Sequence, residues 1–143
     1  MNWSFWTMHM KTRTPTSQEI EELVSYLPRL YAEGFTPIKK WEGGTKDQDG
    51  ILTMPWPEYN KVVKDFFRIA SSECWIDHGY SPEEAVRMLA NDNIIGTANI
   101  DQIKIMLTYC VRGERFCDGH WGAMIKSGRI RRLLQRLAEL QPE

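Results

Sequence analysis

Acidic and basic side chains that could perform hydrolytic chemistry gather in one short segment of the chain. Glu114, Asp118 and His120 supply two carboxylates and an imidazole, the groups that general acid–base catalysis uses most often. If residues 114–127 form one helix, Asp118 and His120 are two positions apart and point to nearly opposite sides. They cannot then form a local carboxylate–imidazole pair. A small hydrolase-like enzyme centred on these three residues, with or without a metal, is therefore kept as the alternative functional hypothesis.

Cys117 adds a nucleophile to the same segment. It lies three residues before His120, so on a helix the thiol and the imidazole share a flank, as a nucleophile and its base would. The same helix places Cys117 on an apolar stripe with Trp121 and Ile125, where a cysteine usually packs as a small hydrophobic residue. We therefore expect Cys117 to be buried in the core.

Pairs of cysteine and histidine also suggest a metal site. Cys74 precedes His78 by four positions and Cys117 precedes His120 by three, so each pair shares a helix face. Two such pairs on adjacent helices could close a tetrahedral zinc site. The spacing matches no zinc finger or knuckle, and a helix end explains His78 as well, through nearby terminal carbonyls. We therefore expect no metal or other cofactor, and keep these four residues as zinc candidates.

Arginines account for much of the remaining polar chemistry. Arg112 and Arg115 enclose Gly113 and Glu114 at a corner between two predicted helices. An arginine can bind a carboxylate and the free carbonyl groups of a helix end at the same time. We expect these residues to tie the corner together, with an anion pocket as the alternative.

A second group of arginines lies nearer the C-terminus. Arg129, Arg132 and Arg136 follow one helical edge, in a stretch that contains no acidic residue before Glu139. Such an edge could bind the phosphates of nucleic acid, and it is also the usual pattern of a solvated helix face. The candidate binding residues are therefore Arg112, Arg115, Arg129, Arg132 and Arg136.

Three amphipathic helices must position these candidates. Apolar residues recur at helical spacing from Asn99 to Leu140, and Gly113 and Gly128 stand where helices would stop. Their apolar stripes must be buried against other elements, so this stretch is expected to form the centre of a helical domain.

The rest of the chain adds further helices. A capping box at Thr16 to Glu19 begins the first, and Pro28 must kink or split it. Others are expected to begin at Pro57 and at Ser81. The predicted fold class is mainly α, a compact bundle of about six helices with a small β-hairpin near residues 38–54.

The predicted hairpin joins residues 38–42 to residues 51–54 across the loop GGTKDQDG. Asp47, Asp49 and Gly50 in this loop imitate part of a calcium-binding EF-hand. The position that should carry a bidentate Glu is Trp56, however, so we expect a solvated turn instead of a calcium site.

Two regions are expected: an N-terminal arm over residues 1–15 and a single helical domain over residues 16–141. Trp3, Phe5 and Trp6 give the arm several aromatic side chains outside the helical pattern. We expect the arm to pack on a partner subunit or to dock late onto the body.

The composition is that of an ordinary globular chain. The 143 residues are 42% hydrophobic and 26% charged, and the formal net charge of −1 argues against binding a polyanion through global charge. Three cysteines cannot all pair, no signal peptide precedes them, and no apolar run approaches membrane-spanning length. We expect a cytoplasmic protein with reduced thiols and no membrane contact.

One segment also resembles a known family. The run LTYCVRGERFCDGHW at residues 107–121, followed by Gly128 and a Leu-rich helix, resembles small bacterial and archaeal proteins of unknown function. The hallmark of that family is an R-G-E-R-F-x-x-G-x-W-like segment, which stands here at residues 112–121. The resemblance is looser back to the Met54 to Trp56 region, and residues 1–15 have no counterpart. It implies a neighbourhood of folds and carries over no activity.

These observations favour a non-catalytic interaction or regulatory module. We expect a helical domain that self-associates, as a homodimer, or binds a protein partner. Nucleic acid is kept as a possible partner through the arginine-rich face.

Overall fold

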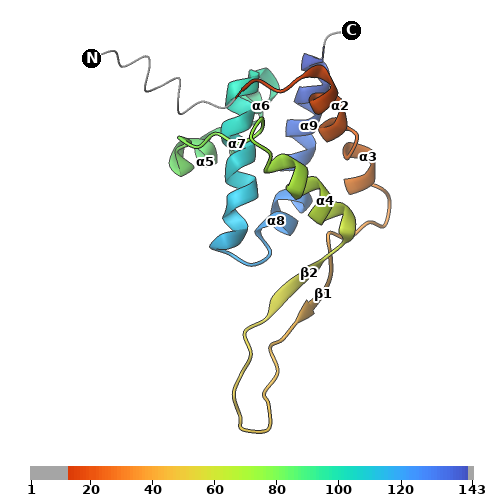
Figure 1. Cartoon of the computed structure of the whole chain (residues 1–143), viewed down its shortest axis with the longest axis vertical. Coiled ribbons are helices and arrows are strands. Elements are labelled where there is room, and N and C mark those ends of the chain that lie inside the picture. Colours follow the sequence, from red (N-terminus) through yellow and green to blue (C-terminus); the bar gives the residue numbers. More distant parts are fainter. Residues whose placement is uncertain (1–12, 142–143) are drawn as a thin grey trace, which may run out of the picture.

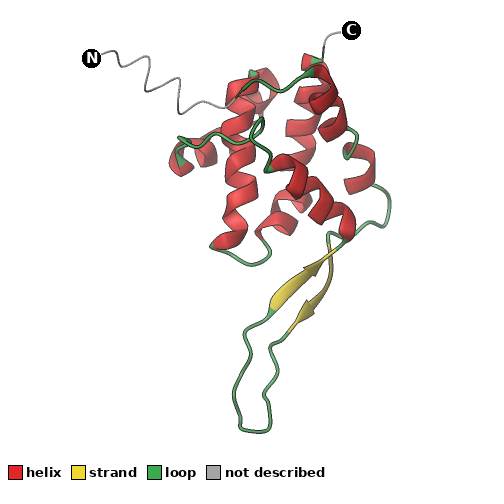
Figure 2. Ribbon diagram, in the orientation of Figure 1, coloured by secondary structure: helices red, strands yellow, loops and turns green. Residues whose placement is uncertain are grey.

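The computed structural model describes residues 13–141, most of which form packed helices (Figures 1 and 2). In chain order the elements are α2 (Ser17–Val24), α3 (Leu27–Leu30), β1 (Ile38–Glu42), β2 (Trp56–Tyr59), α4 (Lys61–Ala70), α5 (Pro82–Leu89), α6 (Asp92–Thr97), α7 (Ile100–Arg112), the 3₁₀ turn η1 (Gly113–Arg115), α8 (His120–Lys126) and α9 (Arg129–Leu140). The predicted fold class, mainly α with a small hairpin, is confirmed. The aromatic side chains of the predicted arm, Trp3, Phe5 and Trp6, lie outside the described residues.

Local capping chemistry fixes the beginnings of several helices. The Thr16 hydroxyl accepts the Glu19 amide, and the Glu19 carboxylate accepts the Thr16 amide, so the predicted capping box is present. Asn99 caps α7 in the same way, and the Ser81 hydroxyl caps α5. Pro28 splits the first predicted helix, because it lies in the first turn of the separate helix α3.

The predicted hairpin forms, but its second strand is not the predicted one. β1 coincides with residues 38–42, and it pairs antiparallel with β2 in a register that joins Ile38 to Tyr59 and Glu42 to Trp56. Residues 51–54 contribute only an isolated bridge between Leu52 and Lys46. Burial explains the difference: Tyr59 packs into the core, whereas Leu52 and its neighbours are exposed and have no buried face to fix a strand register.

This pairing also displaces the next helix. We expected a helix from Pro57, but Pro57 lies in β2 and α4 begins at Lys61. A proline is tolerated in β2 because each strand of a two-stranded sheet is an edge strand. The loop between the strands is the predicted solvated turn, in which the Asp47 carboxylate accepts the amides of Asp49 and Ile51, both at 2.9 Å.

The core lies between the longer helices. Helix α7 contacts α4, α5, α8 and α9, and α9 also contacts α2, α3 and α6. Phe66, Phe67 and Trp75 are among the largest side chains that are fully buried there. The hairpin leaves this body, and Figure 1 shows it projecting beyond the end where α7 meets α8. Within residues 13–141, no helix has both the length and the apolar character that crossing a membrane requires.

Candidate functional site

The candidate residues lie at the corner between α7 and α8, which is not built as predicted. In place of one helix over residues 114–127, the chain makes the 3₁₀ turn η1, a short loop and then α8. The backbone of Gly119 has a φ of +91°, a left-handed conformation that favours glycine and ends any continuous helix. As a consequence Phe116 and Cys117 are exposed. The expectation of a buried Cys117 was wrong, because the chain turns between Cys117 and Trp121.

Glu114 holds this corner together. Its carboxylate accepts three hydrogen bonds of 2.8 Å, from the Tyr59 hydroxyl and from the amides of Gly119 and Trp121. A carboxylate at this place accepts hydrogen bonds from amides at the start of α8 that have no acceptor within the helix. The Tyr59 hydroxyl also accepts the Gly122 amide at 3.3 Å, and burial together with the Glu114 carboxylate raises the pKa of Tyr59. Glu114 therefore joins the hairpin to α8.

His120 is enclosed in the protein. Its ring lies edge-on to Tyr109, with centroids 5.1 Å apart, and directly against Gly113, where any side chain would overlap it. Its Nε2 atom is buried and has no hydrogen-bond partner within residues 13–141. Burial lowers the pKa of His120, an effect that the nearby Glu114 charge opposes. Burial therefore favours the neutral form of the His120 imidazole.

No hydrogen bond joins the three catalytic candidates to one another. Glu114 is occupied by the α8 amides, and His120 is packed against Gly113. Asp118 is exposed, and its carboxylate has no hydrogen bond or ion pair with another described residue.

The four zinc candidates lie in different environments. Cys74 is buried in the core, where burial raises the pKa of its thiol to about 11, opposing the thiolate that a metal requires. Cys117 is exposed and His120 is buried. In the described part of the chain, no three His, Cys, Asp or Glu side chains are grouped so that they could hold a metal ion.

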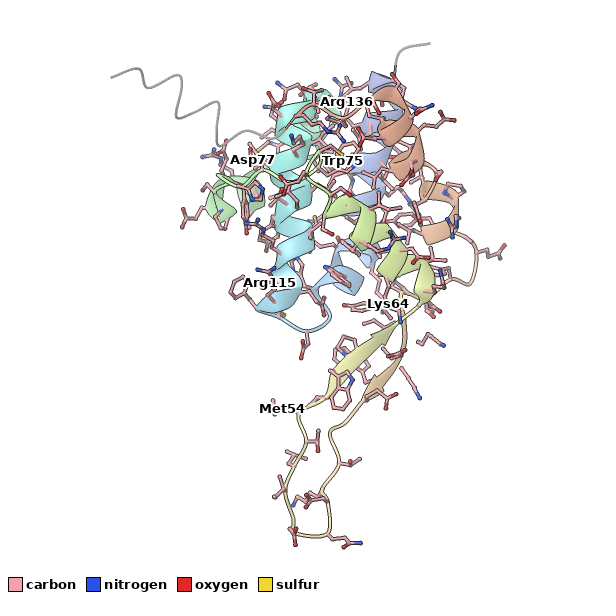
Figure 3. The ribbon with its side chains drawn as sticks, in the orientation of Figure 1. Met54, Lys64, Trp75, Asp77, Arg115 and Arg136 are labelled. Atoms are coloured by element: carbon pink, nitrogen blue, oxygen red, sulfur yellow. The ribbon has the colours of Figure 1, made fainter. Side chains whose placement is uncertain are left out.

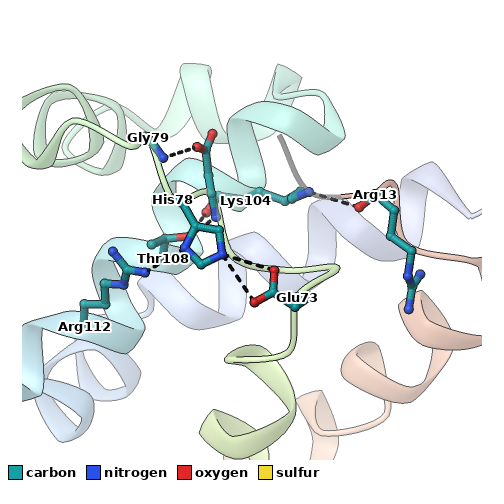
Figure 4. Close-up of polar contacts among 8 residues, drawn as sticks. Arg13, Glu73, His78, Gly79, Lys104, Thr108 and Arg112 are labelled. Atoms are coloured by element: carbon teal, nitrogen blue, oxygen red, sulfur yellow. Dashed lines mark hydrogen bonds and ion pairs between the residues drawn. The ribbon is translucent and has the colours of Figure 1, made fainter. Parts of the chain in front are cut away.

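His78 lies in the loop after α4, where hydrogen bonds fix its position (Figure 4). The Asp77 amide donates to the Thr108 hydroxyl at 2.9 Å, which attaches this loop to α7. The His78 ring then bridges two charged groups. Its Nε2 lies 3.1 Å from the Glu73 carboxylate and its Nδ1 lies 3.4 Å from the Arg112 guanidinium. Because a guanidinium can only donate, Nδ1 must be the acceptor and Nε2 the donor.

Next to His78 the surface is hollowed by a cavity of about 460 Å³ at the end of α7. Its lining combines apolar and charged groups: Ser71, Ile76, His78, Val111, Arg112, Glu114, Arg115 and Trp121. Two of the five predicted binding arginines, Arg112 and Arg115, therefore meet at one cavity. We call it the corner cavity.

The arginines of α9 have structural contacts instead. Arg136, near the opposite end of the body from Arg115 (Figure 3), donates to the Ala98 carbonyl at 2.9 Å and to Glu139 at 3.0 Å. Arg132 pairs with Asp92 at 3.2 Å. Since Asp92 and Ala98 begin and follow α6, these bonds attach α6 to α9. Arg129, the third residue of the predicted phosphate-binding edge, is partly buried.

Residues 15–143 match a family described as Family of unknown function (DUF6508). The chain belongs to this family. The expected membership of an uncharacterised family is thereby confirmed, and the DUF6508 match includes the whole corner between α7 and α8. No curated protein and no solved structure matches the chain. The comparisons attach no catalytic activity to the DUF6508 chain.

Sequence reasoning missed one surface of this DUF6508 chain. Five large apolar side chains are exposed along the hairpin and its loop: Trp41, Ile51, Leu52, Met54 and Trp56. We call them the hairpin surface; Trp41 is 51% and Met54 is 75% exposed, and Met54 lies on the projecting part (Figure 3). Their signal in the sequence was two tryptophans and a methionine in a segment without helical periodicity.

Proposed function

We propose that the chain is a non-catalytic interaction module that pairs with a second copy of itself through strand β1. The observation that carries this proposal is the hairpin surface. Monomeric proteins rarely expose contiguous apolar patches larger than a few hundred Å², and larger patches usually mark sites of association. Here the exposed apolar side chains lie on the element that projects from the body (Figure 1).

The hairpin also has an open edge. Within residues 13–141, β1 makes strand hydrogen bonds only with β2. An unpaired edge strand is a template for pairing with another chain, and a two-stranded sheet alone is only marginally stable in water. Pairing β1 with β1 of a second copy would produce a four-stranded antiparallel sheet. β2 is less suited to this role because it contains Pro57, which lacks an amide donor.

The charges of β1 are complementary to themselves. Lys40 is exposed and Glu42 is half-buried, and Lys40 Nζ lies 3.0 Å from Glu42 Oε1. If two β1 strands run antiparallel with Trp41 facing Trp41, each Lys40 lies opposite Glu42 of the other copy. Cross-strand pairs of opposite charge, and aromatic pairs, each contribute about 0.2–1 kcal/mol. One twofold arrangement therefore satisfies both charges and covers the tryptophan.

A charge exchange tests this arrangement. Sedimentation velocity over a range of micromolar concentrations should show the wild-type chain as a concentration-dependent dimer. Lys40→Glu places two carboxylates opposite each other at both ends of the strand and should shift the equilibrium to monomer. The double variant Lys40→Glu with Glu42→Lys restores opposite charges and should restore the dimer.

Lys39→Glu is the matched control. Lys39 is exposed and adjacent to Lys40, but it lies at the register shift between Ile38 and Lys40. In this arrangement Gly43 of the other copy lies opposite it, so Lys39 has no charge to pair with. It should leave the dimer unchanged. A wild-type chain that stays monomeric at every concentration, or a Lys40→Glu variant that dimerises as well as wild type, would show that β1 is not the contact.

A further inference from the structure

The corner cavity has the size and chemistry of a small-molecule site. Its volume of about 460 Å³ lies within the range of ligand pockets, about 300–1,000 Å³. It is lined by residues at the end of α7 and by His78 of the loop after α4. A ligand in it would touch the two guanidinium groups of the R-G-E-R segment.

The positive charge of the cavity is available for binding. Arg115 is exposed, and its guanidinium has no hydrogen bond or ion pair with any other residue in 13–141. Arg112 has only a long contact of 3.4 Å with His78 Nδ1 and lies 5.5 Å from the centroid of the Tyr80 ring. Glu114 is the acid in the lining, and its carboxylate is bound by three donors. Two arginines therefore line the cavity without an ion pair to any carboxylate in residues 13–141.

Three side chains, those of Ile76, Val111 and Trp121, make up the apolar part of the cavity wall. Trp121 stacks on Phe67 with centroids 4.5 Å and planes 6° apart, which fixes the indole in the wall. Its Nε1 donates to the Val111 carbonyl at 2.9 Å, so the indole offers carbon atoms and no hydrogen-bond donor to a ligand. Ile76 and Val111 extend this apolar wall.

We propose that the corner cavity binds a small organic carboxylate whose body is apolar. A carboxylate matches the planar fork of an arginine through two parallel hydrogen bonds, and here Arg112 and Arg115 supply two such forks. The apolar body of the ligand then packs on Trp121 and its apolar neighbours. Neutral apolar molecules do not belong to this class of ligand, because they leave the guanidiniums without an anion. Simple inorganic anions do not belong to it either, because they leave the Trp121 indole uncovered.

Titration of the full chain with 3-phenylpropionate tests the proposal, followed by the amide and indole resonances in NMR spectra. The Trp121 indole N–H and the Arg115 amide should shift in a saturable way. The neutral alcohol 3-phenylpropanol, and inorganic phosphate, should each bind at least about tenfold more weakly, since each lacks one half of the recognition.

Variants assign the binding to the cavity. Arg115→Ala should weaken binding of 3-phenylpropionate by about tenfold and leave the spectrum of the free protein otherwise unchanged, because Arg115 has no partner to lose. Arg131→Ala is the matched control: Arg131 is also exposed but lies over the Tyr31 ring, in a separate cavity. The proposal is overturned if 3-phenylpropionate gives no saturable shift, if the alcohol binds equally well, or if Arg131→Ala weakens binding and Arg115→Ala does not.

Discussion

Gly113 and His120 depend on each other at the scale of single residues. The backbone of Gly113 has a φ of −61°, which any residue can adopt, so conformational freedom is not the reason for a glycine there. The reason is space, since the His120 ring fills the place where a side chain would begin. The same contact encloses His120 and removes it from the candidates for an exposed general base.

Replacement of Gly113 by Ala should therefore destabilise the protein. The added methyl group meets the His120 ring, and overpacking of this kind costs about 1–3 kcal/mol. Gly96→Ala is the matched control, because a methyl group at Gly96 in α6 meets no atom within 4 Å. Alanine is the better helix former by about 0.5–1 kcal/mol, so this variant should be slightly more stable than wild type. Equal chemical denaturation curves for the two variants would contradict the close contact with His120.

His120 should also make stability depend on pH. Its pKa is lowered in the folded protein by burial, while in the unfolded chain it is about 6.5. The stability from burying a neutral imidazole is complete above that unfolded value and is lost as the pH falls toward the folded value, because the unfolded chain binds the proton first. The free energy of unfolding of wild type should thus decline below about pH 6.5 more steeply than that of His120→Leu. Parallel pH profiles for the two proteins would rule out a buried neutral His120.

At the scale of elements, Glu114 replaces the cap that α8 lacks. The N-cap residue of α8 is Gly119, which has no side chain to cap the helix, and the Glu114 carboxylate accepts the amides of Gly119 and Trp121 from the preceding turn. The same carboxylate accepts the hydroxyl of Tyr59 in β2. One side chain thus orients α8, holds the base of the hairpin, and leaves Arg112 and Arg115 beside the corner cavity.

Loss of this carboxylate should weaken the corner as a whole. Glu114→Ala leaves buried donors without an acceptor, which costs about 1–3 kcal/mol, and Glu114→Gln should cost less because one oxygen remains. Asp118→Ala is the matched control and should stay within about 0.5 kcal/mol of wild type, since its exposed carboxylate has no bonded partner in the described chain. Thermal unfolding compares the three variants, and a Glu114→Ala protein as stable as Asp118→Ala would refute the capping role.

At the scale of the whole molecule, the helical body and the hairpin have different tasks. The core includes Tyr59 at the base of β2 but none of the exposed residues of the hairpin surface. The loop between the strands is held mainly by its own bonds, such as that from the Thr53 amide to the Thr45 carbonyl at 3.1 Å. The body therefore supplies stability, and the projecting hairpin supplies a surface for contact.

Shortening the hairpin tests this division of tasks. Replacement of residues 46–52 by Asn-Gly, a sequence that favours a two-residue turn, closes the hairpin at the Thr45 and Thr53 pair. The free energy of unfolding should change by less than about 1 kcal/mol, because loop length has a small entropic effect and no core residue is removed. A large loss of stability in chemical denaturation would mean that the tip of the hairpin is part of the body.

The sequence by itself determined the features that depend on neighbouring residues. The capping box at Thr16, the split at Pro28 and the solvated turn at Asp47 were all predicted, because each is decided by atoms within a few residues. Helical periodicity likewise predicted the mainly α class, since a buried stripe must recur with the turn of the helix.

Only the tertiary structure decided the contacts between distant segments. The strand partner of β1 depends on the burial of Tyr59, which packs in the core and donates its hydroxyl to Glu114, 55 residues later. Cys117 is exposed because Gly119 turns the chain, and that turn is held by the same carboxylate. Arg136 could be placed on a helix edge from the sequence, but its acceptor is the carbonyl of Ala98. The contacts and exposure of these side chains depend on which distant segments pack together, and the local sequence pattern does not specify that packing.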